Sequence, residues 1–237
     1  MKIYYRISNN SYSKIKLEVA TKEYCLDNFL SVFDRKKIQV NIVADNVTDE
    51  SLIEYLHNLS GVSLEFTKLN NAQSFRYILE KAIKLPPEEI VYFVEDDYLH
   101  LEFSQDCIVE GLTLADYVTL YDAPDKYINH DMGGPNPFIT EGGEISRVLL
   151  TKNRHWKFTN STTMTFAAKV ETLQTDYTTW LIYLASNHPY DFHAFLELGR
   201  RGRRIASPLP SLSTHCELGC LAPLVDWSVL GSNNLSG

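Results

Sequence analysis

Short apolar runs alternate with amphipathic segments along the N-terminal part of the chain. β-Branched and aromatic residues dominate these runs, which predict strands at 3–7, 38–44, 63–69 and 90–94. Apolar residues recur at helical spacing in the segments between them, which predict helices at 21–33, 48–59 and 74–83. The run 90–94 is almost entirely apolar, as expected of a central strand covered on both faces. This alternation predicts an α/β fold with a doubly wound, mostly parallel central sheet flanked by helices.

The C-terminal part of the chain is patterned less regularly. Apolar runs predict further strands at 117–121, 147–150, 162–167 and 204–206, and helical spacing predicts helices at 171–185 and 192–200. The segment 122–144 has neither pattern and contains two Gly-Gly pairs. Loops of this length inside a compact domain are typically lids or binding loops. We therefore expect one domain over 1–230, followed by a flexible tail of small polar residues at 231–237.

Composition and charge narrow the class of protein. With 237 residues, of which 44% are apolar and 22% charged, the chain has the composition of an ordinary globular protein. Its formal net charge of −8 argues against a protein whose main task is to grip a nucleic-acid backbone. The four cysteines are scattered, which argues against a secreted disulfide scaffold. Because the sequence has no apolar leader and no apolar stretch long enough for a bilayer, we expect a cytoplasmic protein without a transmembrane segment.

Three consecutive carboxylates, Glu95, Asp96 and Asp97, follow directly on the apolar strand 90–94. Ligands of open α/β sheets bind beyond the carboxyl ends of the strands, so these acids lie where a site is expected. Side chains alternate along an extended backbone, so Glu95 and Asp97 should face one side and Asp96 the other. Oxygen ligands of this kind suit Mg²⁺ or Mn²⁺, which would also hold a diphosphate. The alternative is an acidic turn neutralised by nearby lysine or arginine side chains.

The order of these elements resembles the nucleotide-sugar half of GT-A glycosyltransferases. The resemblance rests on the segments 43–50, with Asp45 after the second strand, 70–76, and Glu95–Asp97. In that superfamily the acid after the second strand contacts the base or ribose, and a D-x-D element carries the metal and the diphosphate. Here the element begins with Glu95, which leaves open which of its carboxylates touch the metal.

Two later elements add to the resemblance. Pro189-Tyr190-Asp191 resembles the family's x-E-D position, where inverting members place their catalytic base, with Tyr190 at the position of the Glu. Asp191 can also cap the helix that follows it, and Glu197 is the reserve candidate for the base. His215 lies near the C-terminus, where the family often supplies a metal-binding histidine.

The resemblance implies a nucleotide-sugar half over 1–100 and a less regular acceptor half over 101–230. It assigns nucleotide-sugar binding to Arg6, Asp45, Arg76, Glu95, Asp96, Asp97 and Trp156, metal binding to Glu95, Asp97 and His215, and catalysis to Asp191. Trp156 is a stacking platform for a sugar in this assignment, and a core residue is the alternative. A zinc site formed by His215, Cys216 and Cys220 is a further alternative. Structural zinc needs four ligands, however, and this group offers three.

The function implied by the resemblance is that of a metal-dependent glycosyltransferase, either hexosyl or deoxyhexosyl. It would move a sugar from a UDP-sugar to a hydroxyl of a glycan or small acceptor with inversion, using Mn²⁺ or Mg²⁺. The runs Tyr4–Arg6, Glu95–Tyr98, Ser161–Phe166 and Ser213–His215 also resemble small glycosyltransferase domains of bacteria and of large chlorella-virus proteins. That narrower resemblance implies one domain of a larger protein, acting in a host cytoplasm if viral. The alternatives are a sugar nucleotidyltransferase and an inactive glycan- or nucleotide-binding module.

Overall fold

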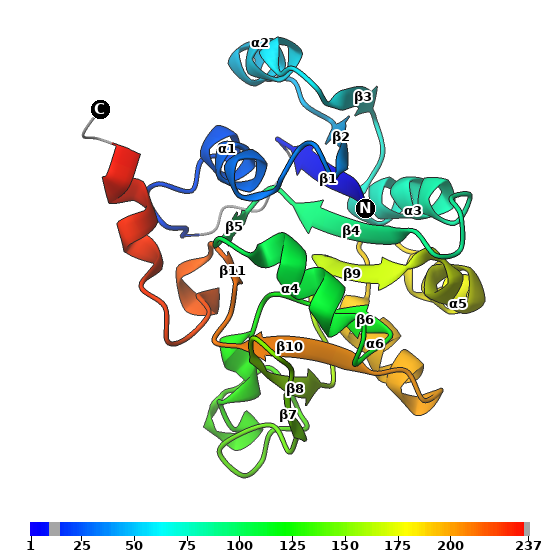
Figure 1. The fold of residues 1–237 in the computed structure, drawn as a ribbon, viewed down its shortest axis with the longest axis vertical. Helices are drawn as coiled ribbons and strands as arrows, with labels where there is room; N and C mark the ends of the chain where they lie inside the picture. The colour runs from blue at the N-terminus through cyan, green and yellow to red at the C-terminus, as the bar shows by residue number, and fades with distance from the viewer. Residues whose placement is uncertain (10–14, 235–237) are drawn as a thin grey trace.

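A mixed β-sheet runs through the centre of the molecule (Figure 1). In the computed structural model, which describes residues 1–9 and 15–234, nine strands form this sheet in the order β3-β2-β1-β4-β9-β6-β10-β8-β7. Their bounds are β1 Lys2–Ser8, β2 Gln39–Asp45, β3 Ser63–Thr67, β4 Ile90–Glu95, β6 Tyr117–Val118, β7 Val148–Leu150, β8 His155–Thr159, β9 Phe166–Lys169 and β10 Ile205–Leu209. A separate antiparallel pair is formed by β5 (Tyr98–His100) and β11 (Ser213–His215).

The direction of the strands changes along the sheet. The first four strands are parallel, with β1 between β2 and β4 and with β3 beyond β2. β9 runs antiparallel to both β4 and β6, and β8 runs antiparallel to β10 and β7. The parallel half places the carboxyl ends of β1, β2 and β4 at one edge, where ligands of such sheets bind. The predicted α/β fold with a mostly parallel central sheet and a less regular second half is confirmed.

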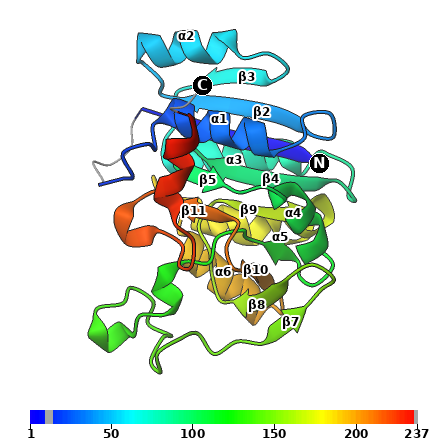
Figure 2. The ribbon, with the colours of Figure 1, turned by 60° about the vertical axis from the view of Figure 1, so that its left-hand side comes forward.

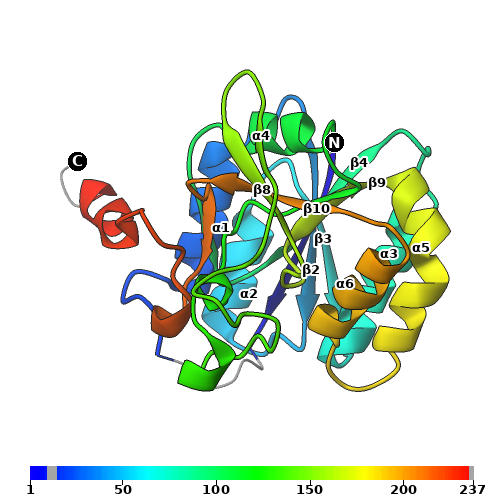
Figure 3. The same cartoon turned by 90° about the horizontal axis from the view of Figure 1, so that it is seen from below.

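Helices cover both faces of the sheet, which gives three layers (Figure 3). Their bounds are α1 Lys22–Val32, α2 Glu50–Asn58, α3 Asn71–Ala82, α4 Ser104–Gly111, α5 Val170–Tyr183 and α6 Asp191–Arg200. On one face α1, α2 and α4 bury Phe29, Leu52 and Ile108 in one apolar cluster. On the other face α3, α5 and α6 share a second cluster around Phe75 and Trp180. Each fully buried side chain of this size contributes about 1.5–3 kcal/mol, so the two clusters hold the layers together.

Side-chain caps fix where the helices of the N-terminal half begin. Thr21 accepts a hydrogen bond from the backbone of α1, and Asp49 accepts two from α2, each cap stabilising its helix by about 1 kcal/mol. Asn70 and Gln73 form a reciprocal capping box at the start of α3. This box extends the helix predicted at 74–83 back to Asn71, at the edge of the site described below.

The polar run before β9 departs from the strand predicted at 162–167. Its hydroxyl groups bond to neighbouring elements: Thr163 Oγ1 lies 2.7 Å from Tyr98 Oη, and Thr165 Oγ1 accepts from the Glu95 backbone N–H at 3.1 Å. The strand therefore begins only at Phe166. β-Branched threonines imitate a strand pattern in the sequence, but these ones are placed by side-chain hydrogen bonds.

Several shorter elements have no counterpart in the predictions, namely α4, β5, β8 and β11. The loop 122–144 contains only the 3-10 turns η1 (Pro124–Lys126) and η2 (His130–Met132), and Figure 2 shows it at the end of the molecule that carries β7 and β8. Further 3-10 turns are η3 (Leu218–Cys220) and η4 (Trp227–Asn234), the latter reaching into the expected tail, of which 235–237 lie outside the described residues. In the part of the chain that is described, no helix is both long and apolar enough to cross a bilayer.

Candidate functional site

A cavity of about 750 Å³ lies at the carboxyl ends of β1, β2 and β4. Seven of the predicted site residues line it, namely Arg6, Asp45, Glu95, Asp96, Asp97, Asp191 and His215. Its opposite wall comes from the segment between α5 and α6 and from the start of α6. Residues far apart in the sequence thus meet where the fold predicts a ligand site.

Arg6 and Glu95 lie side by side because β1 and β4 pair in parallel with these two residues in register. Arg6 Nη2 donates to Glu95 Oε1 at 2.9 Å, and Nη1 donates to the backbone and side-chain oxygens of Asn71 at 2.9 and 2.8 Å. Burial raises the pKa of Glu95 to about 7, with Arg6 opposing the shift and Asp97 and Asp191 adding to it. The site therefore contains a carboxyl group that titrates near neutral pH beside a fixed cation.

Asp96 and Asp97 form a turn between β4 and β5 instead of continuing the extended strand. Asp96 Oδ2 accepts from the Ser8 backbone N–H at 2.7 Å and from Lys22 Nζ at 2.6 Å. Asp97 Oδ2 accepts from Lys16 Nζ at 3.0 Å. The alternation expected of an extended backbone therefore does not apply across this turn, and all three carboxylates of the run line the cavity.

His215 reaches Asp97 because β11 pairs antiparallel with β5, which sets His215 opposite Tyr98. The His215 Nε2 to Asp97 Oδ2 distance is 3.2 Å. Burial lowers the pKa of His215, but the hydrogen bonds to Asp97 and Cys220 and the charges of Asp97 and Glu95 together outweigh burial and raise the pKa to about 10. Burial likewise raises the pKa of Asp97, and the contacts with His215 and Lys16 reverse this and leave the pKa below its usual range.

The separation of these two atoms fits a shared metal ion. Ligands that lie about 2.0–2.2 Å from one metal, at angles of about 90–109°, are separated by about 2.8–3.6 Å. The 3.2 Å between His215 Nε2 and Asp97 Oδ2 falls in this interval. Imidazole nitrogen and carboxylate oxygen form a donor set that Mn²⁺ accepts.

The other edge of the His215 ring faces Glu217 and Cys220, and the ligand atoms of these three residues lie within 4.8 Å of one another. Glu217 Oε2 is 4.0 Å from His215 Nδ1. Cys216, the remaining member of the zinc site considered above, is instead buried and contacts Cys25 of α1. The described residues therefore offer three ligands here where structural zinc needs four.

Asp191 lies in the opposite wall, at the first position of α6. Its Oδ1 accepts from the Phe192 backbone N–H at 2.8 Å, so the carboxylate does stabilise the start of the helix. Burial raises its pKa, against this hydrogen bond and the charge of Lys126. Glu197, the reserve candidate, is outside the cavity and pairs with Arg201 at 2.9 Å. Asp191 therefore stabilises the start of α6 and lines the cavity at the same time.

Three of the predicted nucleotide-binding residues do not have the surroundings that the prediction gave them. Two lie outside the cavity, and the third already makes hydrogen bonds within the protein. Trp156 is fully buried in the core and donates to Thr151 Oγ1 at 2.9 Å, so its alternative as a core residue is the one observed. Arg76 lies on the outer face of α3, pairs with Glu80 at 2.7 Å and is not in the cavity wall. Asp45 does line the cavity, but its Oδ1 already accepts from Thr67 Oγ1 and Leu69 N, both at 2.8 Å.

Sequence patterns missed several residues of the site. Lys16 lies in an irregular segment with no motif around it, and only the fold brings it to Asp97. Asn187 accepts from the Ala72 backbone N–H at 3.1 Å and from Asn70 Nδ2 at 3.0 Å, which ties the segment before α6 to the start of α3. This contact joins the start of α3 to the segment that leads into Asp191. The Asn70-Asn71 pair was the available signal, since it opens a helix next to a strand end.

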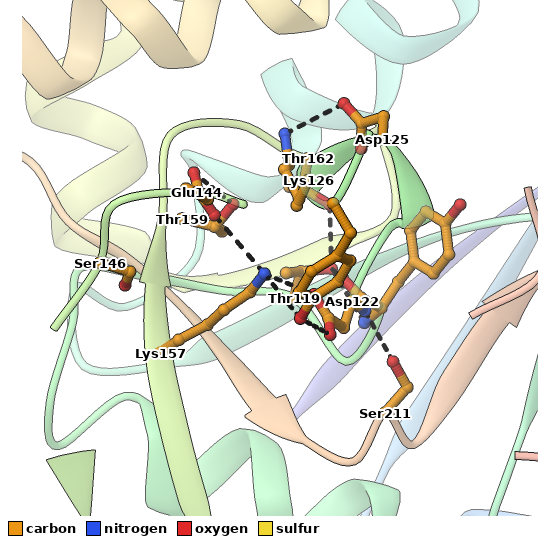
Figure 4. A network of polar contacts seen from close by, with 12 residues as sticks. Thr119, Asp122, Asp125, Lys126, Glu144, Ser146, Lys157, Thr159, Thr162 and Ser211 are labelled. Carbon is orange, nitrogen blue, oxygen red and sulfur yellow. Dashed lines mark hydrogen bonds and ion pairs between the residues drawn. The ribbon is translucent and has the colours of Figure 1, made fainter. Parts of the chain in front are cut away.

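A buried polar network holds both ends of the loop 122–144 beside the site (Figure 4). Lys157 Nζ lies 2.7 Å from Asp122 Oδ1 and 3.5 Å from Glu144 Oε2, at opposite ends of the loop. Lys126 Nζ donates to Ser161 Oγ at 2.6 Å and to Asn160 Oδ1 at 3.0 Å, and burial lowers its pKa. Buried ion pairs of this kind impose one geometry, because removing one partner leaves an uncompensated charge. The two ends of the loop are therefore fixed in one arrangement.

Comparison with known proteins places this architecture. No protein-family model and no curated protein matches the sequence. Among solved structures, GalNAc-T7 with UDP, GalNAc and Mn²⁺ superposes on 90% of this chain with a TM-score of 0.59 at 15% identity. Residues 1–349 of TarS from S. aureus superpose on 87% of it with a TM-score of 0.53 at 14% identity. The chain has the GT-A fold.

The GT-A fold is what these likenesses establish, since the sequence identities are low. This chain spans 42% of the GalNAc-T7 chain and 58% of the TarS chain, so it corresponds to part of each. Within the GT-A fold, the run Glu95–Asp97 begins at the last residue of β4, and its three carboxylates line the cavity. The expectation drawn from the sequence about the architecture is thereby confirmed.

Proposed function

We propose that this chain is a metal-dependent glycosyltransferase that moves a hexose or deoxyhexose from a UDP-sugar to a hydroxyl of a glycan or small acceptor, with inversion. The observation that carries the proposal is the convergence of Glu95, Asp97, His215 and Asp191 on one cavity of a GT-A fold. The GalNAc-T7 structure, which shares the fold, contains UDP and Mn²⁺.

Asp97 and His215, with Glu95 beside them, are the residues that would hold Mn²⁺ or Mg²⁺. When bound, the ion would neutralise charge that develops on the diphosphate oxygens as the nucleotide leaves. Arg6 supports the same end of the cavity, because its guanidinium is fixed by Asn71 and Glu95 and adds a permanent positive charge. Asp45 and its neighbours at the end of β2 would border the nucleoside.

Asp191 is the proposed general base. A new bond forms between the acceptor oxygen and the anomeric carbon, the bond from that carbon to the diphosphate breaks, and its electron pair leaves with the diphosphate. The acceptor hydroxyl proton passes to Asp191. Burial raises the pKa of this carboxyl, which brings it closer to the working pH and makes it a better proton acceptor than an exposed aspartate.

The thiols favour a reducing compartment. All four cysteines are free, and three of them are buried. Proteins of oxidising compartments tend to pair such residues, so we assign the activity to the cytoplasm.

A panel of nucleotide-sugars, incubated with Mn²⁺ and simple acceptors, tests the proposed function. Release of UDP with formation of a glycoside is the expected result. In a parallel incubation with a nucleoside triphosphate and a sugar 1-phosphate, release of pyrophosphate with formation of a nucleotide-sugar would assign the chain to sugar nucleotidyltransferases instead. Nucleotide binding without either product would make it a binding module.

A further inference from the structure

A second hollow, of about 670 Å³, lies in the C-terminal half of the chain. Its lining includes Phe138 of the loop 122–144, Ile145 just after that loop, Phe158 of β8, Asn160 just after β8, and Leu196 of α6. We call this hollow the α6 groove. It is bordered by the loop 122–144, whose ends the lysine network holds in place.

The α6 groove is linked to the residue that follows the proposed base. The rings of Phe138 and Phe192 are 6.3 Å apart, and Phe192 directly follows Asp191. Leu196 lies one helical turn beyond Phe192, about 7.5 Å along the axis and about 140° around it from Asp191. The link to the base is therefore Phe138, which lines the groove and whose ring meets that of the residue after Asp191.

Most of the surface of the α6 groove is apolar, with five apolar side chains beside Glu144, Ser146, Arg147, Thr159 and Asn160. Phe138 is 55% exposed and Ile145 86% exposed, so their side chains are open to a ligand. Glu144, which also lines it, is neutralised internally: its Oε1 accepts from the Asn160 backbone N–H at 2.6 Å, and Lys157 lies 3.5 Å from its Oε2. Exposed aromatic and branched aliphatic side chains in a concave surface bind flat, apolar groups.

We infer that the α6 groove binds an apolar aglycone of the acceptor, so that the acceptor is an aryl or alkyl glycoside and not a free monosaccharide. This inference rests on the proposed function, because it takes Asp191 as the place where the acceptor hydroxyl reacts. Phe138 and Phe158 would pack on the aglycone, while its sugar extends toward Asp191. Neither residue touches the reacting atoms, and both are specificity-determining.

Direct binding tests the inference without knowledge of the natural acceptor. The probes are 4-nitrophenyl glycosides of the common hexoses and deoxyhexoses, each compared with its parent monosaccharide, titrated by NMR in the presence of UDP and Mn²⁺. We expect at least one aryl glycoside to bind about tenfold more tightly than its parent sugar, as burial of about 60 Å² of additional apolar surface would give. Phe138→Ala and Ile145→Ser should remove this advantage, whereas Phe66→Ala should keep it, because Phe66 is on β3 at the opposite edge of the sheet.

The outcomes separate this inference from the function on which it rests. If UDP and Mn²⁺ bind but aryl glycosides gain nothing over their parent sugars, the inference is wrong and the proposed function stands. An aryl advantage that survives both Phe138→Ala and Ile145→Ser also overturns it, since the aglycone then binds elsewhere. Formation of a dimer that buries Phe138, seen by sedimentation, would overturn it in favour of a second copy of the chain. Failure of UDP to bind at all would sink both proposals.

Discussion

Replacement of Asp191 by Asn separates the catalytic role of this residue from its structural one. The structural contact is the 2.8 Å hydrogen bond from the Phe192 backbone N–H to Oδ1, and an asparagine oxygen accepts the same bond. Asn and Asp are nearly equivalent at helix starts, so the free energy of unfolding should change by only a few tenths of a kcal/mol. The proton acceptor is lost, however, and loss of a general base costs about 10²–10⁴ in rate, or about 2.7–5.5 kcal/mol of barrier.

The nucleotide should still bind to this variant. Asp191 lies in the wall opposite the carboxylates of β4 and makes no ion pair with Arg6 or Lys16 among the described residues. Its negative charge raises the pKa of Glu95, so its removal should leave UDP affinity equal or slightly higher. The assay is UDP release under single-turnover conditions, with UDP affinity and urea unfolding measured on the same preparation.

Glu197→Gln is the matched control. It makes the same change from carboxylate to amide on the same helix, but Glu197 pairs with Arg201 outside the cavity. Turnover should stay near that of the unchanged protein. Turnover of Asp191→Asn within a factor of a few of the unchanged protein would refute the assignment of the base, and a large loss from Glu197→Gln would transfer it to that residue.

Three further predictions concern the metal end of the cavity and the core. Asp97→Asn should abolish most of the gain in UDP affinity that Mn²⁺ gives, and Asp96→Asn should reduce this gain less, since only Asp97 contacts His215. Titration of UDP into both variants checks this, and equal losses of affinity would contradict it. Because the pKa of His215 is about 10, a metal ion must displace a proton from this residue to bind it. The affinity for Mn²⁺ should therefore rise about tenfold per pH unit between about pH 7 and pH 8.5. An affinity independent of pH would exclude His215 as a ligand. Trp156→Ala should lower the free energy of unfolding by about 3–5 kcal/mol, because it leaves a cavity in the core. The affinity of the folded variant for UDP should be unchanged. A loss of UDP affinity without a loss of stability would support the role of Trp156 as a stacking platform for a sugar.

Local sequence patterns were sufficient for the frame of the fold. Thr21 and the apolar spacing after it predicted α1, and the apolar run before Glu95 predicted a buried strand with acids at its end. These features depend on neighbours within a few residues, so they can be read without knowledge of the rest of the chain. The carboxylate run lies at the end of a strand and Asp191 at the start of a helix, and both positions could be predicted from the local pattern. In the structure both line one cavity.

The remaining features depend on contacts between distant segments. His215 meets Asp97 only through the β5–β11 pair, and Lys16 arrives from an irregular segment. Arg76 was a different kind of error, because Phe75 and Leu79 of α3 are buried and the same helical spacing turns Arg76 outward. The helical spacing was visible in the sequence. It is stronger evidence for the orientation of Arg76 than a resemblance to the family in a segment without a motif residue.

The central claim is that the cavity above β4 is a divalent-metal site for a nucleoside diphosphate. Calorimetric titration of UDP into the purified chain, once with Mn²⁺ and once with an excess of chelator, tests it most directly. The account predicts clear saturable binding with Mn²⁺ and a loss of at least tenfold in affinity with chelator, because the carboxylates Glu95, Asp96 and Asp97 then face the diphosphate without the ion. Equal affinity under the two conditions, or no binding in either, would contradict it.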